Sequence, residues 1–206
     1  LETKEEIVRA FWELTYVPDG VYETAVAGAH VLRSVRAGDV GEDPWVVRSY
    51  LYAACCAGLD LPVIRGLAEK CGKREINKAA EKVAERGHTD VLDLLASEFG
   101  AKIGGDCLLG AARWGRDVAM IDHLVERYGV DPNAGDDYGW TALHYAARDG
   151  RVRTVKHLVE KRNVDIHKRS RVVVGGHTAL DVAERNGRTE CADYLRALQS
   201  TRPPPS

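Results

Sequence analysis

The sequence has no long apolar run, and it contains one methionine and two phenylalanines. No segment approaches the roughly 20 apolar residues that a helix needs to cross a bilayer. The first residues also lack the basic, apolar and small-residue order of a signal peptide. Because the one methionine is Met120, we expect the chain to be a fragment or a processed product. We expect an intracellular protein, cytoplasmic or nuclear, with no membrane partner.

Cysteine is sparse, and its spacing is irregular. The five cysteines are an odd number without paired spacing, which indicates free thiols in a reducing compartment rather than a disulfide framework. Cys71, His88 and Cys107 match no zinc-finger spacing. No nucleophile and base pattern is present, and no lysine follows the glycines of residues 100–106 as in a phosphate-binding loop. We therefore predict no enzyme, no catalytic residue, no metal and no cofactor.

Excess charge of either sign is also missing, because the formal net charge is −2. This balance argues against a general attraction to nucleic acid or to an anionic membrane. Residues 148–171 are locally different, with nine basic and three acidic residues. They leave one alternative open, which is recognition of an anionic partner, either nucleic acid or a phosphorylated protein. Nucleic acid is the disfavoured partner, and steep salt dependence of binding would support it.

The sequence instead has a repeating pattern of short amphipathic helices that end at glycine. The closing glycines are separated by 29, 28, 35 and 37 residues. Each is followed by a second amphipathic segment with the apolar spacing of one helical face. Such a period predicts stacked helix pairs, because one pair cannot bury its apolar face alone. The closing glycines are Gly58, Gly87, Gly115, Gly150 and Gly187.

The segment DYGWTALHYAARDG, residues 137–150, is the clearest copy. Thr141 is a good N-cap, since its hydroxyl can accept from an unpaired N–H of the first turn. Leu143, Ala146 and Ala147 then lie on one narrow apolar face, and Gly150 allows a left-handed exit. A helix this short needs neighbours to be stable.

This copy, extended to Asp165, strongly resembles the ankyrin repeat, whose unit of 33 residues carries Thr-Pro-Leu-His-x-Ala at its first helix. Ala142 stands where proline is usual, and the matching residues are Thr141, Leu143, His144, Ala146 and Ala147. In the last copy, Asp181 replaces the histidine. The resemblance covers residues 103–199 well and residues 45–102 loosely.

The resemblance implies an all-α solenoid of stacked helix-turn-helix pairs. We expect an N-terminal helical cap over residues 1–44, about five helix pairs over residues 45–199, and a flexible proline-rich tail over residues 200–206. Such arrays generally bind other proteins through a concave face of fingers and first helices. We therefore predict a non-catalytic adaptor, scaffold or targeting module that is monomeric and binds an unidentified protein partner. A spacer or intramolecular docking array within a larger protein is a further alternative.

The resemblance also places partner-binding positions on the finger and the first helices. For Trp140 and Tyr145, burial within the repeat is as strong an expectation as binding, whereas the cluster as a whole indicates an interface. We expect a structural role for His144, bonded to Thr141 or to the turn backbone. The candidate positions are Arg113, Trp114, Asp137, Tyr138, Trp140, Tyr145, Arg148, Asp149, Glu184 and Arg185.

Overall fold

The computed structural model describes residues 44–114, 118–171 and 176–201, and within these ranges it contains ten α-helices and no strand. The expected all-α class is confirmed. The described residues belong to two compact units, one ending at Lys102 and one beginning at Ile103. The expected cap lies outside the described residues, apart from Pro44. Ser200 and Thr201 end the last helix, and the rest of the expected tail also lies outside the described residues.

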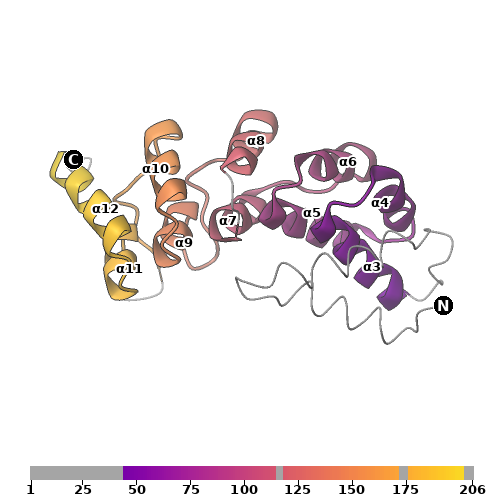
Figure 1. Cartoon of the computed structure of the whole chain (residues 1–206), viewed down its shortest axis with the longest axis horizontal. Coiled ribbons are helices and arrows are strands. Elements are labelled where there is room, and N and C mark those ends of the chain that lie inside the picture. The colour runs from indigo at the N-terminus through magenta and orange to yellow at the C-terminus, as the bar shows by residue number, and fades with distance from the viewer. Residues whose placement is uncertain (1–43, 115–117, 172–175, 202–206) are drawn as a thin grey trace. The chain divides into compact units, whose positions relative to one another are not determined.

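The first unit contains two helix pairs, α3 (Pro44–Ala57) with α4 (Leu61–Ala68) and α5 (Lys73–Arg86) with α6 (Thr89–Phe99). Helix α3 packs on α5, and α4 packs on α6, so that like helices lie together (Figure 1). Small residues at the helix contacts allow this close stacking. The fully buried side chains include Ala54, Ala80, Val83, Leu51, Ile64, Leu92 and Leu95.

Two contacts link the pairs of the first unit. His88 Nε2 lies 3.2 Å from the carbonyl oxygen of Cys56. Gly58 has a φ of +60°, and a Cβ atom there would lie 2.6 Å from the His88 ring, so only glycine fits without a shift. Arg65 of α4 donates from Nε and Nη2 to the carboxylate of Glu98 in α6, at 2.6 Å each.

The second unit contains three helix pairs whose first helices stack in order. These pairs are α7 (Gly105–Trp114) with α8 (Ala119–Tyr128), α9 (Ala142–Arg148) with α10 (Val152–Lys161), and α11 (Ala179–Arg185) with α12 (Thr189–Thr201). Helix α9 packs between α7 and α11 (Figure 1). The predicted apolar face is confirmed, because Leu143, Ala146 and Ala147 are at most 1% exposed.

The helix starts and ends follow the predicted capping chemistry. The Thr141 N–H donates to Nδ1 of His144 at 3.2 Å. In the next pair, the Thr178 N–H donates to a carboxylate oxygen of Asp181 at 2.8 Å, and the Asp181 N–H donates back to the Thr178 hydroxyl at 3.3 Å. Asp181 therefore replaces the histidine as a capping-box partner. Four of the five predicted closing glycines have positive φ, and Gly115 lies outside the described residues.

Between α8 and α9 the chain forms a finger, residues 131–141, closed by a bridge between Gly135 and Thr141. The Arg171 N–H of the following finger donates to the carbonyl oxygen of Tyr138 at 2.7 Å. Gly139 has a φ of +74°, and a Cβ atom there would lie 3.2 Å from the Arg171 nitrogen. The close approach of the two fingers therefore requires glycine at this position.

Candidate functional site

The aromatic–arginine cluster, which we define as Arg113, Trp114, Trp140, Tyr145 and Arg148, lies on one side of the second unit. Arg113 and Trp114 end α7, Trp140 ends the finger, and Tyr145 and Arg148 belong to α9. The ring centroids of Trp140 and Tyr145 are 5.2 Å apart at an angle of 52°. The structure thus brings these five predicted binding residues together, and Asp149, a sixth of the ten, pairs with both arginines.

The two guanidinium groups of the cluster lie over its aromatic rings. The Cζ atom of Arg148 is 5.1 Å from the centroid of Tyr145 and 5.6 Å from that of Trp140. The Cζ atom of Arg113 is 4.5 Å from the centroid of Trp114 and 5.7 Å from that of Tyr145. Both arginines are within cation–π range of Tyr145, so the cluster joins α7 to α9.

Asp136 anchors the finger to the cluster. Its carboxylate accepts a hydrogen bond from the Tyr145 hydroxyl at 2.7 Å and two more from the N–H groups of Tyr138 and Trp140, each at 2.9 Å. Burial and then this carboxylate raise the pKa of Tyr145 to about 12. The finger is therefore held in place by the residue pair Asp136 and Tyr145, which the sequence pattern did not reveal.

Asp149 pairs with both arginines, but unequally. Its carboxylate accepts from Nε of Arg148 at 2.8 Å and from Nη2 at 3.3 Å. Its Oδ2 atom lies 3.9 Å from Nε of Arg113. The Arg148 hydrogen bond and, to a smaller degree, the charge of Asp149 raise the pKa of Arg148. Asp149 therefore neutralises Arg148 directly and Arg113 only at a distance.

Exposure separates the predicted binding residues into two groups. Trp114 and Tyr138 are 48% and 64% exposed, and they are the exposed large hydrophobic residues of the described chain. Asp137, between the finger anchor and Tyr138, is also exposed. Trp140 and Tyr145 are only partly exposed, so they support the surface as well as contributing to it. Trp114, Tyr138 and Asp137 are therefore the most accessible of these residues.

Glu184 and Arg185 have partners within the last helix pair and the finger before it. Glu184 accepts a hydrogen bond from Nη2 of Arg196 in α12 at 2.6 Å. Nη1 of Arg185 lies 2.6 Å from Nε2 of His177. Both side chains are exposed, yet neither takes part in the ring and guanidinium contacts of the aromatic–arginine cluster. Their assignment as binding residues stays a prediction.

His144 is a buried structural residue, as the sequence predicted. The side chain is 1% exposed. Its Nδ1 atom accepts from the Thr141 N–H, and Nε2 lies 2.9 Å from the carbonyl oxygen of His177. Because a carbonyl oxygen only accepts, Nε2 carries the proton of the neutral ring. Desolvation lowers the pKa of His144, which favours this neutral form. The structural role predicted for His144 is confirmed.

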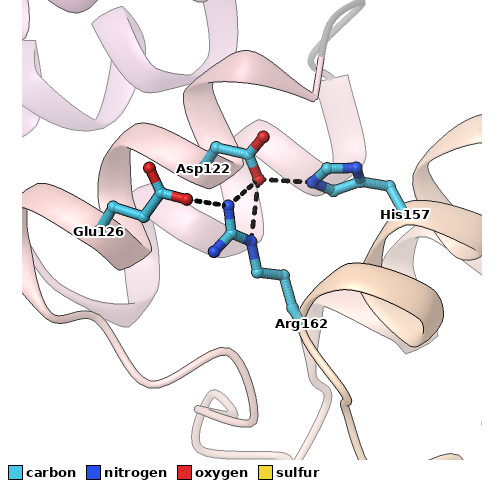
Figure 2. A network of polar contacts seen from close by, with 4 residues as sticks. All are labelled: Asp122, Glu126, His157 and Arg162. Atoms are coloured by element: carbon cyan, nitrogen blue, oxygen red, sulfur yellow. Dashed lines mark hydrogen bonds and ion pairs between the residues drawn. The ribbon is translucent and has the colours of Figure 1, made fainter.

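A polar network joins the second helices α8 and α10 (Figure 2). Oδ1 of Asp122 accepts from Nε2 of His157 at 2.5 Å and from Nε and Nη2 of Arg162, and Glu126 accepts from Nη2 of Arg162 at 2.7 Å. Desolvation raises the pKa of Asp122, but hydrogen bonds from Arg162 and His157 outweigh it and lower that pKa. Sequence reasoning missed this network, although Asp122 and His157 lie one repeat length apart.

The described residues contain neither a membrane-spanning helix nor a cluster of metal ligands. None of the described helices is long and apolar enough to cross a membrane. No group of three or more histidine, cysteine, aspartate or glutamate side chains in the described residues is arranged to hold a metal ion. Burial raises the pKa of the Cys55 thiol, and this side chain is fully buried. The aromatic–arginine cluster with Tyr138 and Asp137 is therefore the candidate functional site.

Comparison with known proteins identifies the repeat. A sequence model of ankyrin repeats, in three copies, matches residues 108–201. Protein VAPYRIN-LIKE from Medicago truncatula is 40% identical over 85 residues, which are 40% of this chain and 16% of that protein. The matched range contains α9, α11, the finger and the Thr141 cap, and it begins within α7. Residues 108–201 of this chain are therefore ankyrin repeats.

Proposed function

We propose that the chain is a non-catalytic protein-binding module whose partner contacts the fingers and first helices of the second unit. Ankyrin repeats generally mediate protein–protein interactions. The observation that carries the proposal is the aromatic–arginine cluster, with Trp114 exposed beside the guanidinium of Arg113. Tryptophan, tyrosine and arginine are the residues that most often dominate binding energy at interfaces.

The proposal includes the domain organisation predicted from the sequence. The ten described helices form five consecutive pairs between Pro44 and Thr201, which supports an array over residues 45–199. Residues 1–44 would then form its N-terminal cap. Five free thiols in the described residues are consistent with a cytoplasmic or nuclear adaptor or scaffold.

Binding of an anionic partner through residues 148–171 is a weaker candidate. Arg162 is paired with Asp122 and Glu126, and Arg148 is paired with Asp149. Lys168 and Arg169 donate to the carbonyl oxygens of Asn133 and Gly176. Several of the nine basic side chains are therefore engaged within the fold, which reduces the charge available to a phosphate backbone.

The test is capture of a partner by wild type and by a variant that changes only exposed side chains. Trp114→Ala combined with Tyr138→Ala leaves the Asp136–Tyr145 bond in place. Tyr194→Ala on α12, a partly exposed tyrosine, is the matched control. Each protein is incubated with a lysate of the source cells, captured proteins are identified by mass spectrometry, and circular dichroism melts report folding.

We expect a protein that is held by wild type and by the control but is lost with the double variant. Capture that persists with the folded double variant would contradict the proposed surface. Capture that disappears after nuclease treatment or falls steeply with salt would favour the anionic partner. A change in compactness of the full-length protein on double substitution, without any captured partner, would favour an intramolecular docking role.

A further inference from the structure

Arg113 is the charged group of the aromatic–arginine cluster whose pairing is incomplete. Its Nε atom is buried, and among the described residues it is the one such side-chain atom without a hydrogen-bond partner. The Oδ2 atom of Asp149 lies 3.9 Å away, which is beyond hydrogen-bond range. That carboxylate already accepts two hydrogen bonds from Arg148. Arg113 therefore holds a positive charge that its own fold neutralises only weakly.

Two other charged groups in or beside the cluster, Asp136 and Arg148, are hydrogen-bonded within the fold. Asp136 accepts from Tyr145 and from two backbone N–H groups, and Arg148 donates twice to Asp149. In contrast, the Arg113 side chain is 39% exposed and makes no hydrogen bond to another described residue. An incoming acceptor would reach the exposed part of the Arg113 side chain without breaking any of these contacts.

The position of the guanidinium defines which acceptor fits. It is stacked over Trp114 at 4.5 Å and lies within 5.7 Å of the Tyr145 ring. A guanidinium held over aromatic rings is weakly hydrated and presents a planar fork at its edge, which matches a carboxylate. Trp114, being 48% exposed, offers apolar surface directly beside that fork.

We propose, building on the proposed function, that Arg113 and Trp114 recognise an acidic segment of the partner protein. An Asp or Glu side chain of the partner would accept from the Arg113 guanidinium, and an apolar side chain next to it would cover Trp114. A singly charged carboxylate suits this site better than a phosphate dianion, because the Asp149 carboxylate lies 3.9 Å from Arg113 and would repel a second charge. A basic segment would be repelled by Arg113 itself.

The first experiment is selection from a random peptide library displayed on phage, with the whole chain as bait. The peptides are fused at their C-termini, so that a selected carboxylate belongs to a side chain. We expect enrichment of Asp or Glu next to an apolar residue. Enrichment of apolar sequences without acidic residues, or of basic sequences, would overturn the inference. This readout needs no variant of the chain and so does not depend on how a variant folds.

The second experiment is a double-mutant cycle between Arg113→Gln and a selected peptide in which Asp or Glu is replaced by Asn or Gln. We expect Arg113→Gln to weaken the acidic peptide about tenfold and to leave the amide peptide nearly unchanged. Arg74→Gln, an exposed arginine of α5, is the control with the same loss of charge, and we expect no change. Additive effects of the two substitutions would contradict a direct contact.

The outcomes distinguish this inference from the proposed function. The selected peptides could lose binding to the Trp114→Ala and Tyr138→Ala double variant and yet show no preference for acidic residues. That result would support the binding surface and contradict the recognition of a carboxylate. Peptides that bind the double variant as well as wild type would reject the surface itself. A library that yields no binding peptide would count against both proposals.

Discussion

Nε2 of His144 and the carbonyl oxygen of His177 are 2.9 Å apart, although 33 residues separate them in the chain. The contact ties the first helix of one repeat to the finger of the next. It requires a proton on Nε2, and the hydrogen bond from the Thr141 N–H requires Nδ1 to stay unprotonated, so the two contacts together need the neutral ring. A single side chain thus caps its own helix and fixes the spacing between two repeats, which makes the array sensitive to the protonation of His144.

We expect the second unit to lose stability as the pH falls below about 6.5, the ordinary histidine pKa. Burial lowers the pKa of His144 in the folded state. The unfolded chain therefore binds a proton at higher pH than the folded chain does, so stability is full above pH 6.5 and declines below it. Urea unfolding at several pH values measures this decline. His144→Gln should remove that component and destabilise the unit by about 1–3 kcal/mol, and an unchanged pH slope in the variant would contradict the assignment.

Asp122→Asn should destabilise the second unit by about 1–2 kcal/mol, since it removes the negative charge that His157 and Arg162 share as hydrogen-bond partner. Glu126→Gln is the matched control. Its partner Arg162 also contacts Asp122, and the Glu126 side chain is 67% exposed, so we expect a change below about 0.5 kcal/mol. Chemical denaturation at neutral pH measures both effects. Equal losses for the two variants would show that Asp122 has no special place in the network.

The lowered pKa of Asp122 also predicts that the second unit loses stability at acid pH. The folded pKa of Asp122 lies below its ordinary value of 3.8, so the stabilisation it provides is present above that value. It is lost as the pH falls through the lower folded pKa. Below about pH 4, the free energy of unfolding should therefore change less steeply with pH for Asp122→Asn than for wild type. Parallel curves for the two proteins would argue against a lowered pKa.

Tyr145→Phe should remove a tyrosine that ionises late in alkaline titration. Burial, and next the hydrogen bond to Asp136, raise the pKa of Tyr145 to about 12. Difference absorbance of tyrosinate follows the titration, and Tyr138→Phe, which changes an exposed tyrosine, is the control. The Tyr145→Phe variant should also lose about 1 kcal/mol because Asp136 loses one of its three donors. Loss of a tyrosine that ionises near the ordinary pKa of about 10 in the Tyr145→Phe variant would instead place that hydroxyl in solvent.

Cys55 should react slowly with a thiol reagent in the native protein. Its side chain is fully buried, and burial raises the pKa of the thiol. Since the thiolate is the reactive form, both factors oppose modification. Labelling with iodoacetamide followed by peptide mass mapping measures the rate, with a urea-unfolded sample as the reference. Rapid labelling of Cys55 without urea would mean that α3 opens readily.

Much of the local structure was determined by the sequence alone. Thr141 and Thr178 start helices because their hydroxyl and backbone groups need only partners three residues ahead. Gly58, Gly87, Gly150 and Gly187 take positive φ because glycine lacks a Cβ atom. The buried face of Leu143, Ala146 and Ala147 follows from helical periodicity. These features depend on neighbours within a few residues, so the amino-acid sequence alone was sufficient to predict them.

The contacts between repeats were decided by the tertiary structure. Asp136 was one acidic residue among several in the finger, and only the folded finger brings it to the Tyr145 hydroxyl. The bond from His144 to His177, the network around Asp122 and the weak pairing of Arg113 likewise join residues far apart in the chain. Helical periodicity states which face of a helix is buried, but it does not state which side chain of the next repeat lies opposite. The sequence therefore determined the repeat, whereas its stacking decided which arginine of the described residues keeps a buried guanidinium nitrogen without a hydrogen-bond partner.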